Sequence, residues 1–126
     1  MPFFSYVDRC TSPADQLLVT GDYADVLVLA KRGFASDGVT FGVWYSSVAH
    51  QMSTIEEMRL RPALLTVLVD AKPFETRYRY VADYIAQEYK PIADIAVEET
   101  SGVRILVDRS RVAKGVDRET GWPCFK

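Results

Sequence analysis

The chain has 126 residues, of which 48% are hydrophobic and 25% charged, and its formal net charge is −2. This balance excludes a disordered tail, a fibrous repeat and a low-complexity linker. The near-neutral charge gives no overall attraction to nucleic acid or to an anionic membrane. A chain of this length buries about two thirds of its unfolded surface on folding, so we expect one domain over residues 1–126.

Two helix-start signals lie in the first third of the chain. Ser12 followed by a proline is a capping residue with a preset first turn, which predicts a short helix that stops at Gly21. Asp22 begins a second candidate, which ends in two basic residues and a glycine. Its apolar centre is equally typical of a buried strand, so both structures stay open for residues 23–32.

Strand and helix signals alternate in the middle of the chain. Residues 39–45 follow an Asp-Gly turn and are rich in β-branched and aromatic side chains, which predicts a half-buried strand. Ser53 and Glu56 form a capping box, the expected start of a short helix that ends before Pro62. Residues 64–69 are apolar on both faces apart from one threonine, which is typical of a strand in the centre of a sheet.

The second half of the chain predicts one long helix and a hairpin. The helix begins at Pro73 and runs to Tyr89. Its expected buried stripe consists of residues three or four positions apart, namely Phe74, Tyr78, Val81, Ile85 and Tyr89. Residues 92–98 and 103–107 flank a glycine-containing turn, which predicts two antiparallel strands.

Together these elements predict an α+β fold, in which helices pack on a mixed sheet. Four strands are expected, near residues 39–45, 64–69, 92–98 and 103–107. The strand at 64–69 matters most, because its central place decides where the residues that follow it lie.

The compartment is inferred from the cysteines and the apolar runs. Cys10 and Cys124 lie near opposite ends, without the short spacing of a zinc site, and one pair does not make a disulfide framework. We expect two reduced thiols; the alternative is a disulfide between the two ends, since chain termini often lie close together. The apolar runs are far shorter than the ~20 residues that span a bilayer, and the first residues do not resemble a signal peptide. A soluble, cytoplasmic protein is therefore expected.

Asp70-Ala71-Lys72 follows the expected central strand. Two positions apart on an extended chain, the carboxylate and the ammonium point to the same side, where they can hold a divalent cation and stabilise charge on a phosphate. These three residues resemble the second half of the metal site of the PD-(D/E)xK nucleases. The resemblance implies an alternative function, a metal-dependent phosphodiesterase in which Asp37 and Asp70 bind Mg²⁺ or Mn²⁺ and Lys72 stabilises the reacting phosphate.

Other chemistries find less support in the sequence. His50 is the only histidine, and no second ligand stands at metal-binding spacing from it. The chain contains neither a nucleophile elbow nor a glycine-rich phosphate loop. A second alternative is a small-molecule pocket lined by aromatic side chains, for which the candidates are Trp44, Tyr45, Tyr80 and Tyr84.

The C-terminal tail, residues 108–126, differs in composition from the rest. It holds five basic and three acidic residues, a net charge of +2, so the preceding residues carry −4. Its closing aromatic residues either fold back onto the sheet as a latch, which we favour, or project toward a partner. The expected contact surface consists of the tail and the adjacent sheet edge, with Arg109, Arg111, Trp122 and Phe125.

The function that these observations favour is a small protein-binding or regulatory module. Its expected partner is another protein or a second copy of the chain in a homo-oligomer. We expect neither catalysis nor a cofactor, and neither nucleic acid nor a membrane as the partner.

Overall fold

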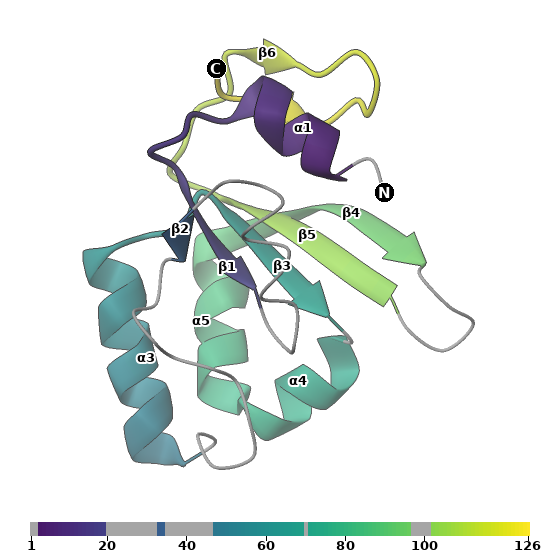
Figure 1. The fold of residues 1–126 in the computed structure, drawn as a ribbon. Coiled ribbons are helices and arrows are strands. Elements are labelled where there is room, and N and C mark those ends of the chain that lie inside the picture. The colour runs from purple at the N-terminus through teal and green to yellow at the C-terminus, as the bar shows by residue number, and fades with distance from the viewer. Residues whose placement is uncertain (1–2, 20–32, 35–46, 70, 97–101) are drawn as a thin grey trace.

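A mixed sheet of five strands forms the centre of the computed structural model, which describes residues 3–19, 33–34, 47–69, 71–96 and 102–126 (Figure 1). The strands lie in the order β2-β1-β3-β5-β4. Their bounds are β1 Gln16–Val19, β2 Gly33–Phe34, β3 Leu65–Val69, β4 Tyr89–Ala96 and β5 Gly102–Asp108. β1 is parallel to β2 and β3, whereas β5 is antiparallel to β3 and β4. The predicted α+β class with a mixed sheet and the predicted hairpin are confirmed.

Strand β3 lies in the middle of this sheet, as its apolar sequence predicts. Leu65, Thr66 and Val67 are each at most 2% exposed. Successive side chains of a strand point to opposite faces, so a buried run such as this one needs a cover on both sides. Leu65 and Val67 belong to one hydrophobic cluster and Leu68 to the other.

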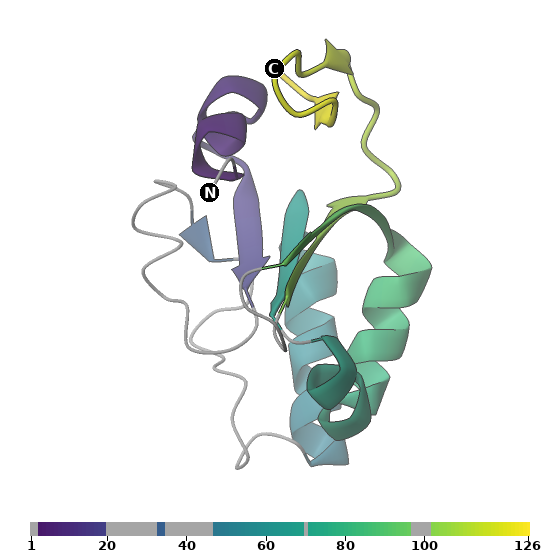
Figure 2. The ribbon, with the colours of Figure 1, turned by 90° about the vertical axis from the view of Figure 1, so that its right-hand side faces the viewer.

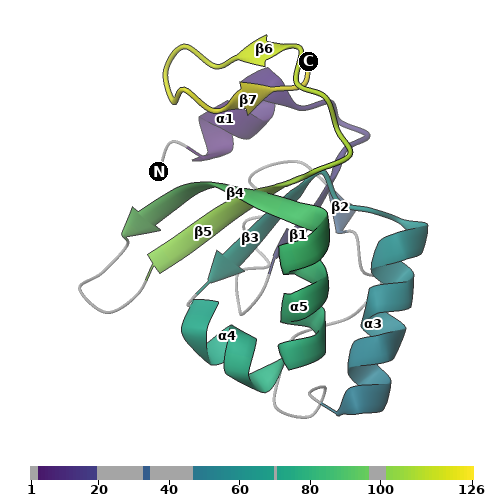
Figure 3. The same ribbon diagram turned by 180° about the vertical axis from the view of Figure 1, so that it is seen from behind.

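Three of the described helices cover one face of the sheet (Figures 1 and 3). They are α3 Val48–Leu60, α4 Ala71–Arg77 and α5 Arg79–Glu88. The predicted helical stripe faces this core, which confirms its burial. The buried members of the cluster are Leu18, Ile55, Met58, Ala63, Leu68, Phe74, Tyr78, Val81, Ile85, Tyr89 and Leu106.

The long helix predicted from Pro73 to Tyr89 is in fact two helices. Helix α4 begins earlier, at Ala71, and the chain leaves the helical conformation at Tyr78, where φ is −117° and ψ is 54°. Tyr89 begins strand β4, so it does not end the helix. The buried stripe continues across the break, which explains why its spacing predicted a single helix.

A side chain from α3 supports the start of α5. The side-chain oxygen Oε1 of Gln51 accepts hydrogen bonds from the backbone amides of Tyr80, at 2.9 Å, and Val81, at 3.3 Å. These amides belong to the first turn, whose donors have no partner within the helix. The helix therefore depends for its start on a residue 29 positions earlier in the chain.

The short helix predicted after Ser12 is wrong, because strand β1 occupies this segment. The Ser12 amide donates to the Asp15 side chain at 2.9 Å, so the capping signal forms a turn before the strand. Leu17 and Leu18 are both fully buried and belong to opposite clusters. Adjacent residues reach opposite sides of a sheet in a strand, and this two-sided burial favours the strand over a helix.

The helix predicted from Ser53 begins five residues earlier, at Val48. Ser47 is its N-cap, and the Ser47 hydroxyl accepts a hydrogen bond from the His50 amide at 3.3 Å. Ser53 therefore lies inside α3 and caps nothing. The helix ends at Leu60, before Pro62, as predicted.

The first helix, α1 Phe3–Cys10, lies at one end of the sheet, on the side away from α3, α4 and α5 (Figure 2). Phe3, Tyr6, Val7 and Cys10 are each at most 1% exposed, and their spacing follows the period of a helix with one buried side. They pack with Leu64 and with buried residues of β1, β3, β5 and the tail, namely Leu17, Leu65, Val67, Val103, Ile105, Val107 and Phe125. This helix was not predicted, although its spacing was a usable signal.

Two predicted elements lie outside the described residues. They are the strand near 39–45 and the segment 23–32, for which helix and strand were both open. Within the part of the chain that is described, no helix has the length and apolar character that crossing a membrane requires.

Candidate binding surface on the C-terminal tail

After β5 the tail returns to α1 and forms a small hairpin beside it (Figure 3). Its strands are β6 Gly115–Val116 and β7 Pro123–Cys124, paired antiparallel with Gly115 opposite Cys124 and Val116 opposite Pro123. The turn between them includes Gly121, whose φ of 76° is a conformation that favours glycine. The first and last segments of the chain therefore meet at one end of the sheet.

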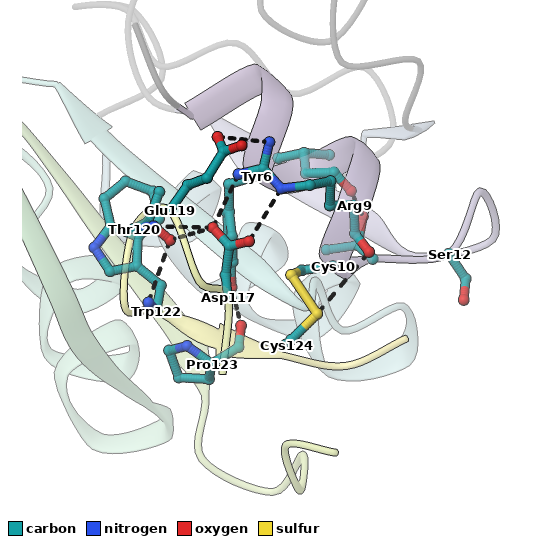
Figure 4. Close-up of a disulfide and its surroundings, with 12 residues drawn as sticks. Tyr6, Arg9, Cys10, Ser12, Asp117, Glu119, Thr120, Trp122, Pro123 and Cys124 are labelled. Atoms are coloured by element: carbon teal, nitrogen blue, oxygen red, sulfur yellow. Dashed lines mark hydrogen bonds and ion pairs between the residues drawn. A yellow bond between two sulfur atoms is a disulfide. The ribbon is translucent and has the colours of Figure 1, made fainter. Parts of the chain in front are cut away.

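A disulfide joins Cys10 at the end of α1 to Cys124 in β7 (Figure 4). The Cα atoms are 4.4 Å apart, although the two residues are separated by 114 positions in the sequence. The Phe125 amide also donates to the Cys10 carbonyl oxygen at 2.8 Å, so the backbones are paired next to the bond. The prediction of two reduced thiols is wrong, because the fold brings the two chain ends together.

A partly buried ion pair holds the hairpin turn to α1 (Figure 4). The guanidinium of Arg9 donates to both carboxylate oxygens of Asp117, at 3.0 and 2.9 Å, and lies 3.2 Å from Glu119. The Thr120 hydroxyl donates to Asp117 at 2.6 Å. These hydrogen bonds, first from Arg9 and then from Thr120, hold the pKa of Asp117 well below its usual range.

The low pKa of Asp117 makes the stability of the protein depend on acidity. In acid the unfolded chain protonates this carboxyl near its ordinary pKa of 3.8, whereas the folded chain resists protonation. The stabilisation is therefore complete above about pH 5 and is lost progressively as the pH falls below this value. We expect Asp117→Asn to flatten this dependence in urea denaturation from about pH 2 to pH 6. Asp83→Asn, at an exposed residue of α5, is the control, and equal pH profiles for both variants would contradict the prediction.

Tyr6 provides a second noncovalent anchor for the tail. Its hydroxyl donates to the carbonyl oxygen of Pro123, and its ring meets the Trp122 ring edge-on with 5.0 Å between centroids. Burial, together with the charge of Asp117, raises the pKa of the Tyr6 hydroxyl, so this donor keeps its proton.

The four residues expected to form the contact surface do not share one exposed face. Phe125 is 6% exposed in the core and Trp122 is half-buried, so the aromatic residues form the latch. Arg109 lies beside α5, and its guanidinium donates to the Ala86 carbonyl oxygen at 3.5 Å. Arg111 lies 3.1 Å from the Asp15 carboxylate and extends over the Phe125 ring, 5.9 Å from its centroid.

A different set of tail residues faces solvent. Val112 is 85% exposed and Val116 is 68% exposed, and the cations Lys114 and Arg118 alternate with them and are also exposed. Neither cation forms an ion pair with a described residue. We call these four residues the tail strip. In the sequence a valine or a cation stands at every second position of this segment, and Ala113 and Gly115 between them are exposed as well.

Of the three residues of the alternative metal site, the described part of the chain contains Lys72 alone. Asp37 and Asp70 lie outside the described residues. Lys72 is exposed in the first turn of α4, so the extended geometry expected for it does not hold. Over the described parts of the chain, no group of three or more His, Cys, Asp or Glu side chains is placed to hold a metal ion.

The other sequence candidates that the structure describes lie on α3 and α5. His50 is exposed in α3, and its Nδ1 is 2.8 Å from the Ser47 hydroxyl oxygen. Tyr80 is exposed on α5 and Tyr84 lies under the Arg59 guanidinium, 5.5 Å from the ring centroid. The remaining aromatic candidates of that pocket, residues 44 and 45, lie outside the described residues.

Comparison with protein-family models, curated proteins and solved structures finds no match to this chain.

Proposed function

We propose that the protein is a binding module whose tail strip docks on an acidic surface of another protein. The observation that carries this proposal is the exposure of Val112 and Val116 in a tail that is attached to α1. The disulfide, the Arg9–Asp117 ion pair and the Tyr6 hydrogen bond supply that anchoring. In this role the chain uses neither a metal nor a cofactor.

The anchoring favours binding because the strip keeps its shape before a partner arrives. Covering a fully exposed valine contributes about 1.5–3 kcal/mol, and little of this is lost in ordering a segment that is already held. Lys114 and Arg118 alternate with the valines and add exposed positive charge that no described residue pairs. Such rim charges set the rate of encounter and the choice of partner more than the affinity.

The charge of the strip favours a partner other than a second copy. In a two-fold symmetric contact through this surface, Lys114 and Arg118 would face the same cations of the other copy. An acidic partner surface has the opposite sign and avoids this repulsion. The proposal keeps the predicted cytoplasmic location, where disulfides are mostly transient or redox-sensing.

The test selects binders from a phage-displayed library of random peptides on the intact, oxidised protein. Selected peptides are then titrated by fluorescence anisotropy against Val112→Ser/Val116→Ser and against Lys114→Glu/Arg118→Glu. We expect peptides rich in Asp, Glu and large apolar residues, with a Kd about ten-fold higher or more for both variants. Added salt is expected to weaken binding further.

Leu60→Ser is the matched control, since Leu60 is an apolar residue of α3 that is 74% exposed and lies outside the tail. It is expected to bind the peptides like the wild type. Selected peptides that bind the strip variants as tightly as the wild type would overturn the proposal. A dimer that light scattering detects in the wild type and not in the strip variants would also overturn it, because the surface would then serve self-association.

A further inference from the structure

We propose that reversible reduction of the Cys10–Cys124 disulfide controls the tail strip by removing the covalent attachment of the hairpin to α1. This inference rests on the proposed function of the strip. Its basis is the position of the disulfide in β7, the strand that pairs with the segment of the tail strip.

Backbone hydrogen bonding connects two residues of the tail strip to Cys124 and its neighbour. The amide of Lys114, a strip residue, donates to the carbonyl oxygen of Cys124 at 2.7 Å. Val116, another strip residue, is paired with Pro123, the neighbour of Cys124. The positions of both strip residues are therefore set by β7, and the disulfide is the covalent attachment of β7 to α1 (Figure 4).

The two cysteine residues differ in their access to solvent. Cys10 is 1% exposed, whereas Cys124 is partly exposed in the hairpin. A thiolate from solvent therefore attacks the sulfur of Cys124, forms a mixed disulfide there and expels the Cys10 sulfur as a thiolate, which takes up a proton. The second thiol of the same dithiol then attacks the mixed disulfide, which frees Cys124 as a thiol and leaves the dithiol as a disulfide. Two electrons and two protons pass from the dithiol to the protein.

The remaining contacts make this step reversible. In the disulfide-bonded structure Phe125 also packs in the core, the Tyr6 hydroxyl donates to Pro123 and Arg9 pairs with Asp117. These contacts keep Cys124 close to Cys10, so the bond can form again once an oxidising disulfide accepts the two electrons. Without the bond, however, only noncovalent contacts oppose the opening of the hairpin, and the strip loses its fixed support.

Hydrogen exchange tests the release without any partner. Amide exchange is measured in the oxidised protein and again after reduction with dithiothreitol, which is the dithiol probe. We expect reduction to speed the exchange of the Lys114, Asp117 and Phe125 amides about ten-fold more than it speeds the exchange of the β3 and β5 amides. Reoxidation is expected to restore protection, and Cys10→Ala/Cys124→Ala is expected to show fast tail exchange with and without dithiothreitol.

Equal acceleration of the tail and sheet amides would overturn the inference, because the disulfide would then act on global stability alone. Unchanged tail exchange would also overturn it.

Selected peptides are expected to bind the reduced protein about ten-fold more weakly than the oxidised protein. If peptides bind and the tail amides do not respond to reduction, the redox inference fails and the proposed function stands. If no peptide depends on the strip, the proposed function fails whatever the exchange shows.

Discussion

Replacing both cysteines, as Cys10→Ala/Cys124→Ala, is expected to lower the free energy of unfolding by about 2–5 kcal/mol. The bond joins residues 114 positions apart, so nearly the whole chain is closed into a loop. Closing a loop of about 100 residues removes enough entropy from the unfolded chain to stabilise the fold by roughly 4.7 kcal/mol in the chain-entropy model. Urea denaturation of the variant and of the oxidised wild type measures the difference.

The reduced wild type is the control for this substitution. Cys10 is buried, so its replacement by alanine also leaves a small cavity in the core. The reduced protein keeps both sulfur atoms and loses only the bond. Both forms are therefore expected to lose stability, the alanine variant by the larger amount. A loss below about 1 kcal/mol in the reduced protein would contradict a bond that closes the chain.

Phe125→Ala is expected to lower the free energy of unfolding by about 3–5 kcal/mol, the usual effect of truncating a buried phenylalanine. Phe125 is 6% exposed and packs with residues of α1 and of the central strands. Thermal and urea denaturation measure the change. Val112→Ala, at a position that is 85% exposed, is the matched control and is expected to change stability by at most about 0.5 kcal/mol.

The same pair of variants separates the two roles considered for the closing aromatic residues. A latch residue stabilises the fold, whereas a residue that meets a partner affects binding and leaves the isolated protein stable. A stable Phe125→Ala protein that no longer binds the selected peptides would contradict the latch. The disulfide holds the tail on α1 in the oxidised variant, so the measured loss reports the side chain and not release of the whole tail.

Local patterns were informative wherever one period persisted over several residues. The apolar run at 64–69 predicted the central strand, because a short strand that is covered on both sides buries every residue of such a run. The stripe from Phe74 to Tyr89 predicted the buried face of α4 and α5, although not the break at Tyr78. The same reasoning applied to Phe3, Tyr6, Val7 and Cys10 would have predicted α1.

Short segments were predicted less well because their local signals were ambiguous. The capping residue Ser12 forms a turn before a strand, and the strand β1 has only four residues to show its alternation. Its parallel neighbour β3 lies more than forty positions later, so pairing decided the structure of this segment. Sheet pairing of that kind leaves no trace in the local sequence.

The amino-acid pattern alone was sufficient for the fold class, the central strand β3, the β4–β5 hairpin and the buried helical stripe. Burial makes neighbouring residues apolar in a pattern that the sequence shows directly. Only the tertiary structure showed the tail strip and the contacts that attach the tail to α1. Cys10 meets Cys124 and Arg9 meets Asp117 across more than a hundred residues, and no local pattern encodes contacts of that range. Those same contacts turn Phe125 inward and leave Val112 and Val116 in solvent.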